Sequence, residues 1–323
     1  MIECNREGKV PYNISIIIPI FNEEGSIQTL YEEIRDVFTD SGINYEIIAV
    51  DDGSRDRTAD VLKGIAEKDH RMKLIIFPHN YGQTAALMAG IDYCEGEVVI
   101  FMDADLQNNP KDIPRFIQKI NEGYDVVCGW RRNRMDPVIR SMFSVIANKI
   151  ISRVSTVMLH DYGCTLKAYR RFIVKELELY GEMHRFIPIY ANWLGARIAE
   201  IIVDHRPRLH GQSKYNMWRI VKVILDLITI KFMGSFKTKP IYFFGGSGIL
   251  CFFLSFLCLI YLVYSKFSLG ISMIQSPVLL LSAMLVIVGV QLILMGVIAE
   301  MLIRTHFEVL KKKTYVIKEK INF

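Results

Sequence analysis

The stretch Glu97-Val-Val-Ile-Phe-Met-Asp-Ala-Asp-Leu-Gln107 decides the fold class of this chain. Residues 97–102 form a short apolar run rich in β-branched residues, which is typical of a strand buried on both faces of a parallel sheet. Three polar residues, Asp103, Asp105 and Gln107, follow at once. Because ligands of open parallel sheets bind beyond the carboxyl ends of the strands, we expect a ligand site here.

Strand-like and helix-like segments alternate on both sides of this stretch. Strands are expected at 14–19, 45–50, 73–77, 97–102, 125–129, 165–169 and 199–203. Apolar residues recur at helical spacing between the first five strands, and one further helix is expected at 141–159. Repeated β-α alternation predicts the α/β class, with a mostly parallel, Rossmann-like sheet covered on both faces.

Two other expected strands also end in acidic residues. The first runs into Pro19-Ile-Phe-Asn-Glu23 and the second into Asp51-Asp-Gly-Ser54. No glycine-rich phosphate loop such as Gly-x-Gly-x-x-Gly is present. Clustered carboxylates repel phosphate unless a cation lies between them, so we expect Mg²⁺ or Mn²⁺ at Asp103, Asp105 and Gln107. A solvated acidic loop is the alternative, and the three converging acidic strand ends argue against it.

Two long uncharged segments follow in the last third of the chain. No charged residue occurs within 240–264 or within 267–299. About 20 apolar residues suffice for a helix to cross the ~30 Å core of a bilayer, so membrane-spanning helices are predicted near 241–264 and 277–299. Buried helices of a soluble core are the alternative. Basic residues flank the pair on one side, which predicts that both termini are cytoplasmic: Lys231, Lys237, Lys239, Arg304, Lys311, Lys312 and Lys313.

The sequence thus divides into four parts: an α/β domain (1–212), an amphipathic juxtamembrane segment (213–239), a two-helix hairpin (240–303) and a basic tail (304–323). Within the second part, 216–233 carries one narrow polar stripe on a broadly apolar helix, which predicts a helix lying in the membrane surface. Packing of that helix on the α/β domain is the alternative. The net charge of +5 is modest, and no nucleic-acid-binding motif is present.

Four motifs together resemble a known family. They are Ser15-Ile-Ile-Ile-Pro-Ile-Phe-Asn-Glu23, Val50-Asp-Asp-Gly-Ser54, Asp103-Ala-Asp-Leu-Gln107 and Arg208-Leu-His-Gly-Gln-Ser-Lys214. In this order they resemble the inverting GT-A glycosyltransferases that act on polyprenyl phosphates, among them dolichol-phosphate mannose synthases and bacterial polyprenyl-phosphate glucosyltransferases. The resemblance covers residues 12–215, and the two trailing spans are similar to the bacterial branch.

The resemblance implies a role for each matching residue. It assigns the nucleoside to Pro19, Phe21, Glu23, Val50 and Asp52, the metal and diphosphate to Asp103, Asp105 and Gln107, closure over the diphosphate to Arg208 and Lys214, and the lipid phosphate to Arg131 and Arg140. Asp161 resembles a proposed general base. It can instead orient the acceptor or the sugar, or serve as a turn residue before Gly163. His184 and Arg185 either contact the sugar or are ordinary surface residues.

The resemblance implies transfer of a hexose from a nucleotide-sugar, with UDP-glucose preferred, to undecaprenyl phosphate in a bacterial inner membrane. GDP-mannose and UDP-linked amino sugars are alternative donors. A processive polysaccharide synthase is disfavoured because the chain has no Gln-x-x-Arg-Trp motif, and a non-catalytic membrane scaffold because the metal set is intact. Small residues in the spans predict a homo-oligomer, or merely close packing of one hairpin: Gly245, Gly246, Ser247, Gly248, Gly289 and Gly296.

Overall fold

The computed structural model describes residues 14–39, 41–132, 157–177, 179, 183–206, 241–269, 272–274, 276–309 and 315–323. The chain divides into two compact units. The first comprises Met1–Leu227 together with Lys313–Phe323, and the second comprises Ile228–Lys312.

The first unit is built on a sheet that has eight strands within the described residues, in the order β7-β5-β6-β4-β1-β2-β3-β8. The strands are β1 (Ile14–Ile20), β2 (Tyr45–Asp51), β3 (Met72–Ile76), β4 (Val98–Phe101), β5 (Val126–Trp130), β6 (Lys167–Arg170), β7 (Ile198–Ile202) and β8 (Glu319–Ile321). β1 to β4 pair in parallel, as do β5 and β7, whereas β6 and β8 are antiparallel to their neighbours. The predicted mostly parallel α/β sheet is confirmed.

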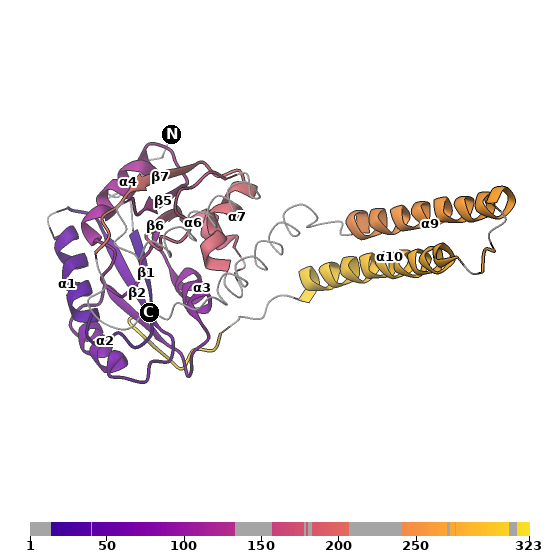
Figure 1. Cartoon of the computed structure of the whole chain (residues 1–323). Coiled ribbons are helices and arrows are strands. Elements are labelled where there is room, and N and C mark those ends of the chain that lie inside the picture. Colours follow the sequence, from indigo (N-terminus) through magenta and orange to yellow (C-terminus); the bar gives the residue numbers. More distant parts are fainter. Residues whose placement is uncertain are drawn as a thin grey trace. The chain divides into compact units, whose positions relative to one another are not determined.

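Helices cover both faces of this sheet (Figure 1). They are α1 (Ile27–Phe38), α2 (Thr58–Ala66), α3 (Gln83–Tyr93), η1 (Pro110–Asp112), α4 (Ile113–Asn121), α6 (Arg171–Lys175), η2 (Met183–Phe186) and α7 (Ile187–Trp193). α1, α2 and α4 lie along one face, and α3, α6 and α7 lie along the other. Because both faces are covered, the central strands are buried throughout, which explains their nearly continuous apolar sequences.

Helix α3 lies unusually close to the sheet. A Cβ atom at Gly90 would fall 2.2 Å from Cγ2 of Ile17, so glycine allows the helix to pack directly on β1. Ile17 itself is fully buried. This close packing fixes the first turn of α3 near the carboxyl end of β1, where the acidic residues lie.

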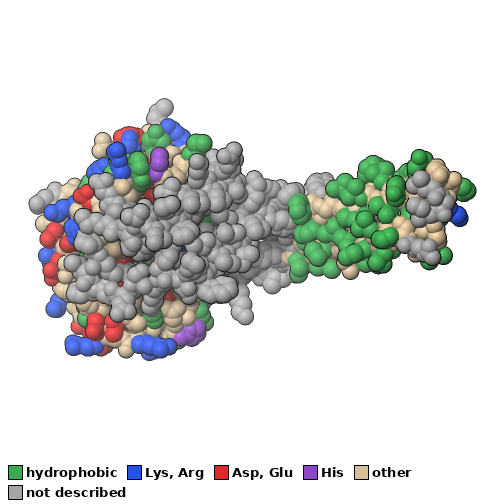
Figure 2. Space-filling view, in the orientation of Figure 1, with side chains coloured by type: hydrophobic (Ala, Val, Ile, Leu, Met, Phe, Trp, Pro, Cys, Tyr) green, Lys and Arg blue, Asp and Glu red, His purple; other side chains and the backbone are tan. Residues whose placement is uncertain are grey.

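The second unit is a hairpin of α9 (Ile241–Leu269) and α10 (Pro277–Val309). Segments Phe243–Ser268 and Pro277–Ala299 are long and apolar enough to cross a membrane, as predicted. Most of their side chains are exposed and apolar (Figure 2), which argues against burial in a soluble core. Gly248 and Gly289 pack against each other, since a Cβ on either would approach the other's carbonyl oxygen to 2.8 or 3.1 Å. These two glycines therefore serve packing within the hairpin, and the homo-oligomer stays a prediction.

Some expectations differ from the structure or lie outside it. A basic tail was expected from residue 304, but α10 continues to Val309, and Glu319–Ile321 is a strand of the sheet in the first unit. The expected helix at 141–159 lies mostly outside the described residues, and residues 157–159 are not helical. Also outside the described residues are the surface helix 216–233, Arg140, Arg208 and Lys214.

Candidate active site

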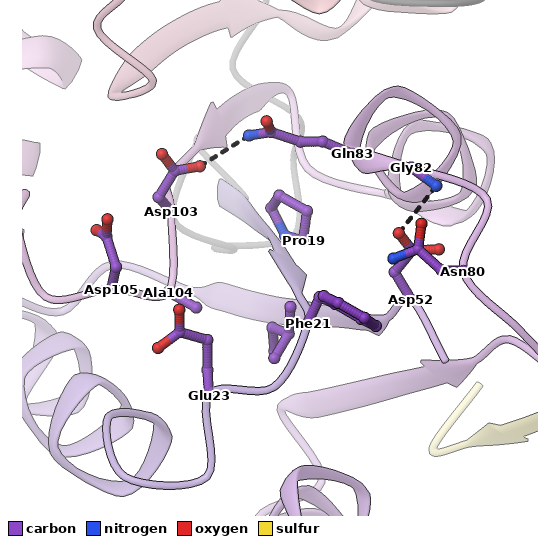
Figure 3. Close-up of a pocket in the computed structure, with 11 residues that line it drawn as sticks. Pro19, Phe21, Glu23, Asp52, Asn80, Gly82, Gln83, Asp103, Ala104 and Asp105 are labelled. Atoms are coloured by element: carbon purple, nitrogen blue, oxygen red, sulfur yellow. Dashed lines mark hydrogen bonds between the residues drawn. The ribbon is translucent and has the colours of Figure 1, made fainter. Parts of the chain in front are cut away.

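A pocket of about 540 Å³ opens at the carboxyl ends of the parallel strands, a size within the usual range for small-ligand sites. Its lining residues are Pro19, Ile20, Phe21, Glu23, Asp52, Asn80, Gly82, Gln83, Asp103, Ala104 and Asp105. Glu23, Asp103 and Asp105 lie on one side, Asp52 and Asn80 lie on the other, and Pro19 and Phe21 lie between them (Figure 3). The prediction that acidic strand ends converge on one site is therefore confirmed.

Asp52 holds the loop between β3 and α3. Its carboxylate accepts hydrogen bonds from the backbone N–H groups of Tyr81 at 2.6 Å and Gly82 at 2.9 Å. Burial raises the pKa of Asp52, and these two hydrogen bonds act in the opposite direction. Val50 is fully buried in β2 beside Pro19 of β1, so it supports the pocket without lining it.

The loops that follow β1 and β2 are joined to each other. Asn22 donates its backbone N–H to Oγ of Ser54 at 2.9 Å, and its side-chain oxygen accepts from the N–H of Arg55 at 2.8 Å. Asn22 adopts a left-handed conformation with φ of 57°, which asparagine tolerates better than most residues. These hydrogen bonds therefore hold the two loops in a fixed relation next to the pocket.

The acidic loop after β4 is held in an uncommon backbone conformation. Leu106 has φ of 61°, a left-handed value that costs a leucine about 1–2 kcal/mol. Asp105 is nearly buried and accepts the backbone N–H of Gln107 at 3.2 Å, and the side chain of Gln83 donates to Asp103 at 2.9 Å. Strain of this kind persists where surrounding contacts impose it, and it is frequent at functional sites.

The donor set suits a small hard cation. Asp103 and Asp105 supply carboxylate oxygens to the same pocket, while Gln107 is not among its lining residues. Within the described residues, no group of three or more His, Cys, Asp or Glu side chains is arranged to hold a metal ion. Two carboxylates are nonetheless the usual protein share for Mg²⁺, which completes its shell with water and substrate phosphates. Asp103 and Asp105 therefore fit such an ion, and the assignment of Gln107 to it stays a prediction.

A second charged group lies at the end of β5. Nε and one terminal nitrogen of Arg131 donate to the two carboxylate oxygens of Asp161, at 2.8 and 3.1 Å. The Asp161 side chain is 1% exposed and also accepts the N–H of Gly163 at 3.0 Å. Burial lowers the pKa of Arg131, but the hydrogen bonds and charge of Asp161 outweigh it, and the negative charge of Asp103 adds to the rise. Phe101 of β4 and Cys128 of β5 both pair with Lys167 of β6, so Arg131 and Asp103 follow their strands at the same edge of the sheet.

Similarity to known proteins agrees with this geometry. Residues 15–178 match the family described as Glycosyl transferase family 2. The chain belongs to glycosyl transferase family 2. This glycosyltransferase is 40% identical to dodecaprenyl-phosphate galacturonate synthase of Rhizobium johnstonii, over 95% of this chain and 92% of the relative. It is 37% identical to undecaprenyl-phosphate 4-deoxy-4-formamido-L-arabinose transferase of Pseudomonas fluorescens, over 95% of this chain and 89% of the relative.

Solved structures share the fold of this glycosyltransferase. Glucosyl-3-phosphoglycerate synthase from Mycobacterium tuberculosis, in complex with Mn²⁺, UDP and phosphoglyceric acid, aligns with a TM-score of 0.55 at 17% identity. The alignment covers 68% of this chain and 78% of that one. The expected GT-A fold, the glycosyltransferase activity and the resemblance to the polyprenyl-phosphate family are thereby confirmed.

The structure of this glycosyltransferase also adds residues that the sequence did not single out. Asn80, Gly82 and Gln83 line the pocket, and all three come from the loop and helix that follow β3. The sequence could have pointed to these residues, because they follow β3, a fourth parallel strand that ends at the same edge of the sheet. His184 is buried, with Nδ1 2.8 Å from Oγ1 of Thr84, so it is not an ordinary surface residue.

Proposed function

We propose that this enzyme transfers a sugar from a nucleotide-sugar to a polyprenyl phosphate and releases the nucleoside diphosphate. The observation that carries the proposal is that the acidic pocket of Asp103 and Asp105 and the Arg131–Asp161 pair lie at the same edge of the sheet. The acidic pocket suits a donor whose diphosphate binds through a cation, and the arginine suits an acceptor that is an anion. The names of the two relatives, both polyprenyl-phosphate enzymes, support the same acceptor class.

The donor binds between the two walls of the pocket. Pro19 and Phe21 offer an apolar surface for the nucleoside, and Asp52 holds the facing loop through its hydrogen bonds to Tyr81 and Gly82. Asp103 and Asp105 hold a divalent cation, Mg²⁺ or Mn²⁺, which supplies positive charge against the diphosphate of the donor. Gln83 keeps Asp103 oriented through its 2.9 Å hydrogen bond. Arg208 and Lys214 are proposed to close over the diphosphate, as the family motif implies.

The acceptor phosphate is held by Arg131. Two of the guanidinium nitrogens are committed to Asp161, which fixes the plane of the group and the direction of its remaining N–H bonds. Asp161 is thereby proposed to orient Arg131 instead of taking a proton. An acceptor phosphate with a second pKa of about 6 is largely ionised at neutral pH and needs little deprotonation. It attacks the anomeric carbon opposite the leaving diphosphate, with inversion. Arg140 is proposed as a further phosphate ligand.

The hairpin holds the enzyme at the membrane that contains its acceptor. β8 follows the hairpin in sequence and pairs with β3, which precedes it. A chain that crosses a bilayer twice returns to its starting side, so this pairing supports two crossings with both flanks on one side. The basic flanking residues favour the cytoplasmic side. We propose an inner-membrane enzyme with a cytoplasmic catalytic unit.

The names of the relatives favour a donor sugar other than the glucose expected from the sequence. The relatives are named for galacturonate and for 4-deoxy-4-formamido-L-arabinose, so their names give UDP-glucose no support. We propose a nucleotide-linked galacturonate as the first candidate donor, because the galacturonate synthase has the higher sequence identity of the two relatives. The modified arabinose is the second candidate.

A donor screen tests this function. Purified full-length enzyme is incubated with undecaprenyl phosphate, Mn²⁺ or Mg²⁺, and each of UDP-galacturonate, UDP-4-deoxy-4-formamido-L-arabinose, UDP-glucose and GDP-mannose. We expect sugar label in a butanol-soluble lipid with one of the first two donors. Label in a polymer, or no lipid product with any donor, would reject the proposal.

A further inference from the structure

A segment that follows the hairpin packs on β3, the strand that leads into one side of the donor pocket. After the hairpin, β8 pairs antiparallel with β3, in the register Leu74↔Ile321, Ile75↔Lys320 and Ile76↔Glu319. The segment 315–323 belongs to the same compact unit as the catalytic domain. We call this segment the C-terminal strap. It is separated in sequence from β3 by the whole hairpin, so its contacts with β3 are long-range.

Tyr315 begins the strap and joins two elements. Its ring stacks on Phe77, which directly follows β3, with centroids 5.3 Å apart and planes at 21°. Its hydroxyl donates to the Asp92 carboxylate in the last turn of α3, at 2.5 Å. The Tyr315 side chain is buried, and burial together with the Asp92 bond raises its pKa, so the hydroxyl keeps its proton.

The two partners of Tyr315, Phe77 and helix α3, flank in sequence a loop that lines the donor pocket. The loop 78–82 runs from Phe77 to the first turn of α3 and contributes Asn80 and Gly82 to the lining. Phe77 also touches Tyr81 edge-on, with centroids 5.4 Å apart. The N–H groups of Tyr81 and Gly82 are the donors to Asp52. A change in the spacing between β3 and α3 therefore moves the groups that shape the pocket.

We propose that Tyr315 is a positioning residue of the donor site, which clamps β3 to α3 and so sets the geometry of loop 78–82. The proposal rests on the proposed function in that the pocket binds a nucleotide. A strap that only stabilises the fold is the competing explanation. It predicts that losing any contact of the strap lowers the stability of the fold, and that losing the contacts of Tyr315 has no additional effect on loop 78–82.

The far end of the strap provides a matched control. The side-chain amide of Asn322 donates to the carbonyl oxygens of Ala66 at 2.7 Å and Met72 at 2.9 Å, next to the amino end of β3. The pocket lies beyond the opposite end of that strand. Asn322→Ala therefore removes these strap contacts, together with one to His70, and none of them involves Phe77, loop 78–82 or α3.

The test uses full-length enzyme in detergent and three variants: Tyr315→Leu, Tyr315→Phe and Asn322→Ala. Binding of UDP and of GDP, each with Mn²⁺, is measured by calorimetry. We expect Tyr315→Leu to weaken binding about tenfold and Asn322→Ala to leave it within about twofold, even if both lower the melting temperature. Tyr315→Phe keeps the stack and loses the Asp92 bond, so its affinity is expected between the two.

Hydrogen exchange provides a readout that needs no ligand. We expect the amides of Tyr81 and Gly82 to exchange about tenfold faster in Tyr315→Leu and at the wild-type rate in Asn322→Ala. Equal exchange in the two variants would overturn the positioning role and leave only a stabilising strap. If wild-type enzyme binds neither nucleotide, the proposed function fails, and the exchange measurement still decides the role of Tyr315.

Discussion

Asp161 accepts hydrogen bonds from two nitrogens of the Arg131 guanidinium, although the residues stand 30 positions apart in the sequence. Oδ2 also lies 3.4 Å from the backbone nitrogen of Arg131, and Oδ1 accepts from Gly163. The oxygens of Asp161 are thus engaged by groups that stabilise the carboxylate. A buried pair of this kind orients the arginine, whereas a general base needs an oxygen directed at its substrate.

Arg131→Ala is expected to impair the use of the lipid phosphate more than the binding of nucleotide. Removing one partner of a buried ion pair also destabilises a protein by about 3–5 kcal/mol, so folding must be measured alongside. The checks are the KM for undecaprenyl phosphate and the affinity for nucleoside diphosphate with Mn²⁺, at a temperature where the variant is folded. Arg171→Ala, a change at the start of α6, is the control. Equal losses for both ligands would contradict an acceptor role.

Asp161→Asn distinguishes orientation from proton transfer. The amide keeps the size of the side chain but supplies only one acceptor oxygen to Arg131, so the KM for the lipid phosphate is expected to rise about tenfold. The shape of the profile of kcat against pH is expected to stay that of the wild type. If Asp161 is a general base, the acidic limb of the profile disappears in the variant and kcat falls at every pH.

Asp105→Asn is expected to lower kcat at least about 100-fold, because it weakens the cation site that stabilises the leaving diphosphate. Asp36→Asn, on the exposed surface of α1, controls for the loss of one negative charge. Chelation of divalent ions should abolish wild-type activity, and added Mg²⁺ or Mn²⁺ should restore it. A variant that keeps a tenth of the wild-type rate at saturating metal would remove Asp105 from the site.

Gly53→Ala is expected to destabilise the enzyme and to weaken nucleotide binding. Gly53 has φ of 68°, and an added Cβ would lie 2.5 Å from the carbonyl carbon of His79, within loop 78–82. Gly42→Ala is a matched control, since Gly42 has φ of 63° with no atom within 4 Å of the added Cβ. The control carries only the conformational penalty of about 1–2 kcal/mol. Comparable nucleotide affinity in the two variants would contradict the role of this contact.

The sequence predicted those parts of the fold that are marked by the composition of a short continuous segment. β1, β2 and β4 are buried on both faces, so each is an apolar run, and acidic residues follow at the shared edge of the sheet. This sufficed to bring Glu23, Asp52, Asp103 and Asp105 to one pocket.

The parts that the sequence did not predict depend on long-range contacts. β8 has three residues, two of them charged, and becomes a strand only by pairing with β3 across the intervening hairpin. The contact between Arg131 and Asp161 is likewise a tertiary one, and residue types alone did not assign it. Loop 78–82 was overlooked because its residues are not acidic, although β3 ends at the same edge as β1 and β2.

The central claim is that the sugar alone moves from the nucleotide to the lipid phosphate. The most direct test uses a UDP-sugar that carries one isotope in the sugar and another in the β-phosphate. The sugar is the one that the donor screen identifies. The labelled donor is incubated with the enzyme, undecaprenyl phosphate and Mn²⁺. The lipid and aqueous phases are then counted separately. Our account predicts that the sugar label enters the lipid and that the phosphate label stays in the aqueous phase as UDP. In Asp105→Asn we expect neither the labelled lipid nor the labelled UDP to form. Both labels in the lipid, which is the result of sugar-phosphate transfer, would contradict it.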